Sequence, residues 1–166
     1  LAFLELLKSQ RKQSLNGLIL TVSVERLALQ SKEEQRATFI SLRKRILDVQ
    51  KHLQGEFPLY VVFTKCDYLA GFSEFFEHLN QEERQQLWGI NFAKLANSQQ
   101  RVLDTFDSEF DELLKRLNER LISVMHHEIT PKRRELIKDF PLQMESIKKP
   151  IAYFLQHIAD ITTLNS

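Results

Sequence analysis

The first half of the chain shows two short apolar runs with a long amphipathic segment between them. The run from Leu18 to Val24 is largely apolar on both faces, which is typical of a parallel strand covered by helices on two sides. Ser31 then precedes two acidic residues, as at a helix start, and apolar side chains follow at helical spacing: Phe39, Leu42, Ile46, Val49 and Leu53. A second β-rich run, Leu59 to Thr64, comes next. This order predicts a βαβ unit with two parallel strands.

The second half of the chain has a purely helical pattern from about Val102. Apolar residues recur every three or four positions and predict one long amphipathic helix: Leu103, Phe106, Phe110, Leu113, Leu117, Leu121 and Val124. Thr130-Pro131 should break this helix, Pro141 should limit the short helix after it, and Pro150 should kink or restart the last one. The last helix carries its own stripe: Met144, Ile147, Ile151, Phe154, Leu155 and Ile158.

Two strands alone do not form a stable sheet, so the predicted sheet needs partners. Nothing after Asp67 has the pattern of a strand, and the segment from Leu1 to Gln10 has helical spacing. We therefore expect the missing strands to precede Leu1, so that the chain begins in the middle of a domain. The first residue is not Met and no signal-peptide pattern follows, which fits a piece of a longer protein.

Charge and composition narrow the classes of function. The chain has 23 Lys and Arg against 22 Asp and Glu, whereas strong nucleic-acid binders carry a basic excess or a basic face. Short basic clusters lie in helical patterns with acidic neighbours and are interpreted as solvated helix faces: Arg43–Arg45, Lys132–Arg134 and Lys148–Lys149. Cys66 is the only cysteine, which excludes an internal disulfide and a multi-cysteine metal site and favours an intracellular setting. No apolar run reaches the roughly 18 residues that cross a bilayer.

The second strand ends in Thr64-Lys65-Cys66-Asp67, a motif with a specific chemistry. In GTPases, an (Asn/Thr)-Lys-x-Asp sequence at the carboxyl end of a parallel strand reads the guanine base. The Asp oxygens accept hydrogen bonds from guanine, the Lys stem lies along the ring, and the first residue pins neighbouring loops. We therefore predict Thr64, Lys65 and Asp67 as base-binding residues. The alternative is an ordinary strand-end turn in which Asp67 caps the next segment, the helix-like stretch Phe72 to Leu79.

The motif and the order of the elements together predict the fold class, which is α/β followed by all-α. We expect residues 1–96 to be the rear part of a GTPase-like α/β domain with a partial parallel sheet, and residues 97–166 to be a helical extension. The phosphate-binding sequence G-x-x-x-x-G-K-[ST] is absent, so the chain by itself is not expected to be an enzyme and no catalytic residue is predicted. No metal is expected, because the adjacent His126 and His127 diverge on a helix and no other ligand cluster occurs.

Several stretches resemble the IcmF/TssM family, in the family's order and over nearly the whole chain. The resemblance covers both strand regions, the GFSEFF and EERQQLWG segments, and parts of the helical region. The matching stretches are Leu15–Val24, Phe57–Asp67, Gly71–Phe76, Glu82–Gly89, Phe106–Phe110, Leu117–Leu121, Arg133–Ile137 and Phe140–Pro141. Phe72, Phe75 and Phe76 are interpreted as packing residues rather than as a binding box. Trp88 is interpreted as a core or interdomain anchor rather than as a ligand-stacking group.

The resemblance implies a place in bacterial secretion. Proteins of this family are inner-membrane components of type VI secretion systems and of the related type IVB system, with a cytoplasmic GTPase-like domain that has a helical extension. They pair with a DotU/TssL-type inner-membrane protein and meet other secretion-apparatus components. We therefore expect these partners, at the cytoplasmic face of the bacterial inner membrane. No cofactor is expected in this chain, and GTP or ATP with Mg²⁺ stays open for the longer protein because the family varies in whether its phosphate-binding loop is intact.

Two functions remain as alternatives. The first is a scaffold that stabilises the secretion membrane complex through protein contacts, in which Thr64, Lys65 and Asp67 are vestigial. The second is a GTPase or ATPase switch that regulates assembly of the apparatus, with these residues reading the base and catalysis supplied by the preceding sequence. The sequence favours the scaffold, because it contains none of the parts that handle phosphate. A nucleic-acid-binding module ranks third, given the balanced charge.

Overall fold

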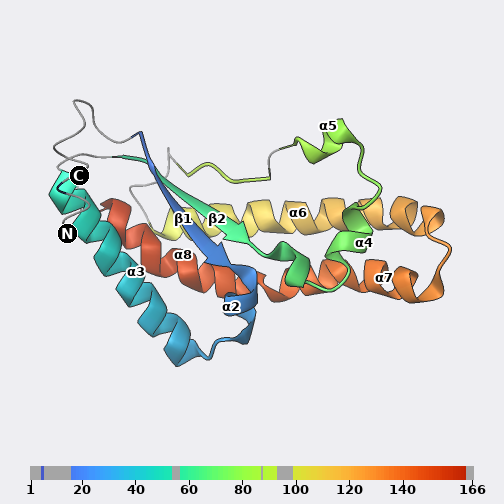
Figure 1. The fold of residues 1–166 in the computed structure, drawn as a ribbon, viewed down its shortest axis with the longest axis horizontal. Coiled ribbons are helices and arrows are strands. Elements are labelled where there is room, and N and C mark those ends of the chain that lie inside the picture. Colours follow the sequence, from blue (N-terminus) through green and yellow to red (C-terminus); the bar gives the residue numbers. More distant parts are fainter. Residues whose placement is uncertain (1–4, 6–15, 54–56, 87, 93–98, 164–166) are drawn as a thin grey trace. The chain divides into compact units, whose positions relative to one another are not determined.

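The computed structural model describes residue 5 and residues 16–53, 57–86, 88–92 and 99–163 (Figure 1). The chain forms two compact units, Leu1–Thr64 and Lys65–Ser166. The boundary that we expect between residues 96 and 97 lies outside the described residues and stays a prediction. The helical segment expected at Leu1 to Gln10 also lies outside them, apart from Glu5, which is helical.

The first unit contains a two-stranded parallel sheet whose strands are joined through a long helix (Figure 1). Strand β1 (Leu18–Ser23) pairs with β2 (Leu59–Thr64) residue by residue from the first position to the last. Helix α3 (Lys32–Leu53) lies between the strands in the sequence. The predicted βαβ unit with parallel strands is therefore confirmed. Two residues of the predicted apolar stripe of α3 are buried: Phe39 and Ile46.

Local capping determines where the helices of the first unit begin. The Ser31 amide donates to Glu34 Oε2 at 2.8 Å and the Glu34 amide to Ser31 Oγ at 3.3 Å, a reciprocal capping box at the start of α3. The hydrogen bond from the Ser31 backbone lowers the pKa of Glu34. Helix α2 (Val24–Leu29), which we did not predict, follows β1 directly because Ser23 Oγ accepts a hydrogen bond from the Arg26 amide at 3.3 Å. The first strand is therefore one residue shorter than expected.

One face of the sheet is exposed, contrary to the expectation of strands covered on both sides. Ile19 and Tyr60 are paired across the strands and are 67% and 55% exposed. Val62, two residues further along the same face, is 43% exposed, whereas Val22 on the opposite face is buried. An apolar run predicts that a strand can be buried. It does not show which of its faces another element covers.

The second unit is a set of packed helices. Its helical elements are, in chain order, the 3₁₀ turn η1 (Cys66–Tyr68), α4 (Phe72–Phe76), α5 (Gln81–Arg84), α6 (Gln99–His127), α7 (Pro131–Ser146) and α8 (Lys148–Thr163). Helix α6 packs against α7 and α8, which run back along it, and the short α4 packs against α7 (Figure 1). Most residues of the predicted stripes are buried: Phe106, Phe110, Leu117, Val124, Met144, Ile147, Ile151, Phe154, Leu155 and Ile158. Leu103, Leu113 and Leu121, also predicted, are only half-buried. The helix expected from Phe72 to Leu79 ends earlier, at Phe76.

Of the predictions made from the prolines of this unit, some were confirmed and one was wrong. The break at Thr130-Pro131 is confirmed, because α7 begins at Pro131, and so is the restart near Pro150, because α8 begins two residues before it. Pro141 does not limit a short helix: α7 continues through it to Ser146, so that prediction was wrong. Proline removes one N–H donor from a helix, and burial of this part of α7 outweighs that loss. The buried residues are Ile137, Phe140, Pro141 and Met144.

Candidate functional site

The predicted base-binding residues lie in a tight turn at the carboxyl end of β2. Thr64 is the last residue of the strand, and its hydroxyl donates to the Val22 carbonyl at 3.4 Å. The boundary between the two units falls directly after it, and Lys65 and Asp67 are both exposed. A turn does follow the strand, as the alternative predicted, but Asp67 is the N-cap of neither η1 nor α4, whose cap positions are Lys65 and Gly71, so the predicted capping by Asp67 was wrong. Base recognition by Thr64, Lys65 and Asp67 stays a prediction.

The turn itself has an unusual backbone at Lys65. Its φ of 58° and ψ of 41° lie in the left-handed region, which costs a non-glycine residue roughly 1–2 kcal/mol. Two backbone hydrogen bonds hold the turn closed: the Tyr68 amide donates to the Lys65 carbonyl at 3.1 Å, and the Leu69 amide to the Cys66 carbonyl at 3.0 Å. Burial, and then the charge of Asp67, raise the pKa of the Cys66 thiol, which favours its protonated form.

The turn leads directly into α4, which is seated on α7. Gly71, at the N-cap of α4, has φ 84°, and a Cβ at this position would lie 2.1 Å from the Leu136 carbonyl oxygen. Only glycine allows this close approach of the two backbones. The rings of α4 surround the buried Phe140, with centroid distances of 5.8, 5.0 and 5.5 Å respectively for Phe72, Phe75 and Phe76. The interpretation of these residues as packing residues is confirmed.

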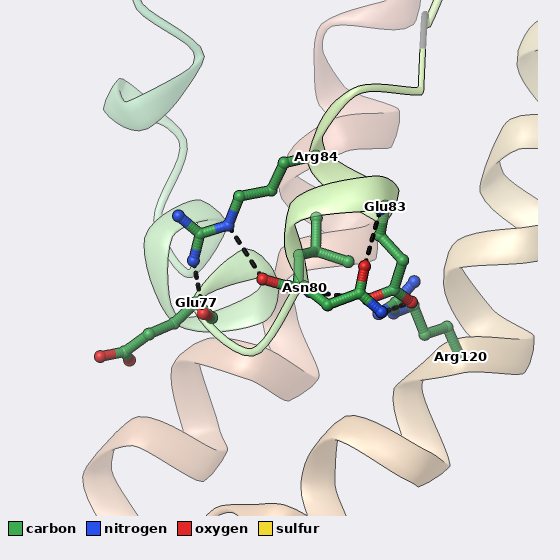
Figure 2. Close-up of polar contacts among 6 residues, drawn as sticks. Glu77, Asn80, Glu83, Arg84 and Arg120 are labelled. Carbon is green, nitrogen blue, oxygen red and sulfur yellow. Dashed lines mark hydrogen bonds and ion pairs between the residues drawn. The ribbon is translucent and has the colours of Figure 1, made fainter.

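A hydrogen-bonded cap fixes the segment after α4 to α6 (Figure 2). At the start of α5, the Glu83 amide donates to Asn80 Oδ1 and the Asn80 amide to Glu83 Oε2, both at 2.9 Å. Glu83 Oε1 accepts a hydrogen bond from Arg120 of α6 at 3.1 Å. Arg84 donates to two carbonyl groups of the connection between α4 and α5, each at 2.9 Å. The hydrogen bond from the Asn80 backbone is the largest cause of a lowered pKa at Glu83.

Arg133 joins α4 to the loop between α6 and α7. Its guanidinium pairs with Glu77, directly after α4, and its Nε donates to Glu128 Oε2 at 2.7 Å. Glu128 is only 9% exposed, and its Oε1 also accepts a hydrogen bond from the Thr130 amide at 2.8 Å. The bond from the Thr130 backbone, and then that from Arg133, lower the pKa of Glu128 to about 2. Glu128 is therefore ionised over the whole physiological range and organises the loop around it.

These ion pairs were not predicted. Arg133 and Lys148 belong to short basic clusters that we interpreted as solvated helix faces, and for these two residues the interpretation was wrong. The Arg133 side chain is 35% exposed and that of Lys148 is 20% exposed. Lys148 binds Asp111 at 2.6 Å and Asp107 at 3.4 Å. The two residues of the pair Lys148–Asp111 are 37 positions apart along the chain, and those of Arg133–Glu77 are 56 positions apart. At such a separation in the sequence, the local spacing of residues does not indicate the contact.

Comparison with known proteins decides the family. The profile of the IcmF-related N-terminal domain matches residues 1–165. The chain belongs to this family. It is similar to the type VI secretion system component TssM1 of Pseudomonas aeruginosa, with 40% identity over 160 residues, which cover 95% of this chain and 14% of that protein. No solved structure matches. The resemblance to the IcmF/TssM family that the sequence motifs indicated is therefore confirmed.

Three further features of this IcmF-related chain bear on function. Trp88 packs edge-to-face on Phe76, with ring centroids 5.1 Å apart, and is 53% exposed, so it is a packing residue at the surface rather than in the core. Among the residues that the structure describes, no group of three or more His, Cys, Asp or Glu could hold a metal ion, and His126 and His127 belong to no such group. None of the helices in the described ranges is long and apolar enough to cross a membrane.

Proposed function

We propose that this chain is part of a secretion-system scaffold protein and stabilises the secretion membrane complex through protein-protein contacts. The observation that carries the proposal is the family match over residues 1–165, together with 40% identity to a type VI secretion component over 95% of the chain. The matched part is 14% of that relative, so the chain contributes one region of a larger protein. Its partners are then a DotU/TssL-type inner-membrane protein and other components of the apparatus, at the cytoplasmic face of the bacterial inner membrane.

The construction of the second unit supports a structural role. Three of its long charged side chains make contacts between elements: Arg133 to Glu77 and Glu128, Arg120 to Glu83, and Lys148 to Asp107 and Asp111. Such pairs fix the geometry of the helices. A rigid helical unit of this kind suits an element that holds other proteins in place, and we propose that this chain is not an enzyme by itself.

A nucleotide-dependent switch is the second candidate, and one observation favours it. Lys65 adopts a left-handed backbone at the carboxyl end of a parallel strand, and backbone strain of this kind persists where the surroundings enforce it, often at ligand sites. In this version, residues 1–96 are the rear part of a GTPase-like α/β domain. Thr64, Lys65 and Asp67 then read the base of GTP or ATP, and the phosphate-binding loop and Mg²⁺ belong to a preceding part of the longer protein.

Two substitutions in the longer protein separate the scaffold from the switch. Asp67→Ala removes the carboxylate that the switch needs and leaves the packed helices intact, whereas Phe140→Asp places a charge at the centre of the aromatic cluster. The scaffold predicts that Asp67→Ala retains both secretion and copurification of the TssL-type protein, and that Phe140→Asp loses both. Loss of secretion with Asp67→Ala, at an unchanged protein level, would favour the switch.

A further inference from the structure

The turn that carries Lys65 and Asp67 is linked through α4 to the hairpin formed by α6 and α7, by three successive sets of contacts. We propose that this hairpin sets the conformation of the turn, so that a ligand or protein that engages one of them acts on both. The inference goes beyond the proposed scaffold function and deepens the switch candidate, since it names the element that controls the predicted base-binding turn, and it rests on that candidate for its role in secretion. It concerns the second unit alone, to which the turn and the hairpin both belong.

The first set of contacts is the backbone between the turn and α4. The Tyr68 amide donates to the Lys65 carbonyl, the Leu69 amide to the Cys66 carbonyl, and the Phe72 amide to the Leu69 carbonyl, at 3.0 to 3.1 Å. Leu69 is 4% exposed, so the connection is anchored in the core. No loosely held linker therefore separates the turn from α4. A change of backbone conformation at Lys65 has to be taken up by α4 itself.

The second set fixes α4 to α7. Gly71 lies so close to the Leu136 carbonyl that even one added carbon atom would collide with it. Phe140, which is fully buried, contacts three rings of the α4 helix. Helix α4 therefore cannot slide or rotate on α7 without breaking close backbone packing and an aromatic cluster. Both contacts come from consecutive turns of one helix, α7.

The third set consists of ion pairs on either side of the connection between α4 and α5, one at Glu77 and one at Glu83. Arg133 connects Glu77 with the buried Glu128 in the loop of the hairpin. On the other side, Glu83 binds Arg120 on α6 (Figure 2). The segment that follows the turn is thus held by both helices of the hairpin. Opening the turn by way of α4 costs contacts in all three sets, so the turn and the hairpin open together.

Hydrogen exchange of the 166-residue chain tests this coupling, with the Tyr68 and Leu69 amides as reporters of the turn. Phe140→Leu should accelerate exchange at these two amides together with the amides of α7, each by about tenfold or more, since it opens a cavity under α4. The matched control is Phe39→Leu, which removes the same atoms from a Phe that is 2% exposed in the other unit. It should leave the Tyr68 and Leu69 amides within about twofold of the parent chain.

A second pair of variants keeps the test decisive if Phe140→Leu does not fold. Arg133→Gln removes the link to Glu77 and should accelerate the Tyr68 and Leu69 amides. Lys148→Gln removes a comparable cation that pairs with α6 away from α4, and should leave exchange at these two amides unchanged.

The proposal is overturned if α7 opens faster in Phe140→Leu or Arg133→Gln while exchange at the two reporter amides is not accelerated. It is also overturned if Phe39→Leu accelerates them equally. The measurement uses no nucleotide and no secretion partner, so its failure and that of the proposed scaffold role are distinguishable.

Discussion

At the scale of single residues, Glu128 links the backbone of the loop between α6 and α7 to the side chain of Arg133. It is a nearly buried carboxylate that binds the backbone of the loop between α6 and α7 on one side and the Arg133 guanidinium on the other. Removing one partner of a buried pair leaves the other without compensation, which destabilises more than losing an exposed pair does. The loop is therefore expected to depend on the charge at this position.

Lowering the pH should show that the stability of the second unit depends on the charge of Glu128. The pKa of Glu128 is lowered from its ordinary value of 4.5 to about 2, so its stabilising contribution is present above pH 4.5 and is lost as the pH falls toward 2. Glu128→Gln should lower the free energy of unfolding at pH 7 and flatten its decline between pH 4.5 and 2. Urea unfolding followed by the fluorescence of Trp88, the only tryptophan, measures this in the second unit. The exposed Glu119→Gln is the control, and an unchanged pH profile for Glu128→Gln would contradict the assignment.

Gly71 gives a second prediction at this scale. Gly71→Ala should destabilise the second unit by about 2–4 kcal/mol, because the new methyl group meets the Leu136 carbonyl and the residue must keep a positive φ. Gly89→Ala is a matched control, since nothing lies within 4 Å of a Cβ there, and it should change stability by less than about 0.5 kcal/mol. Equal effects of the two substitutions in urea unfolding would show that α4 is not seated on α7 as described.

Single residues also mark the limit of what the sequence could predict. The Thr64–Asp67 motif was visible because its residues are adjacent, and the GFSEFF segment was visible through its resemblance to a family. The contacts that hold these segments were not visible. Arg133 and Glu77 are 56 positions apart, and Gly71 meets the backbone of Leu136, so neither contact leaves a local pattern.

At the scale of elements, periodicity and proline position predicted the helices and strands correctly where no tertiary packing opposed these local preferences. The second strand, the parallel pairing, the long α6 and the start of α7 all follow from periodicity and proline position. The failures have physical causes. Pro141 was expected to limit a helix, but the core residues around it keep α7 continuous. Helix α2 was missed because it has only six residues and depends on one cap, Ser23.

The capping box of α3 provides the prediction at this scale. Ser31→Ala removes the Oγ acceptor of the Glu34 amide and should cost about 1 kcal/mol of helix stability, seen as faster hydrogen exchange in the first turns of α3. Ser41→Ala, on the exposed side of the same helix, has no cap to lose and is the matched control. If the two variants exchange alike, Ser31 does not determine where α3 begins.

At the scale of the whole molecule, the division into two units falls inside the predicted base-binding motif. Thr64 closes the first unit and Lys65 opens the second. The family was predictable from the sequence, because its motifs recur in order along nearly the whole chain and the family profile matches residues 1–165. Whether Thr64, Lys65 and Asp67 bind a base could not be predicted in the same way. Reading a base needs phosphate-binding parts as well, and these are absent from this sequence.

The central claim is that this chain acts through protein contacts and not through nucleotide chemistry of its own. Isothermal calorimetry of the 166-residue chain with GTP and Mg²⁺ tests it most directly, with Asp67→Ala as the matched variant. We expect no measurable binding to either protein, because Thr64, Lys65 and Asp67 offer contacts to the base but none to the phosphates. Micromolar binding of GTP that is abolished by Asp67→Ala would contradict the account.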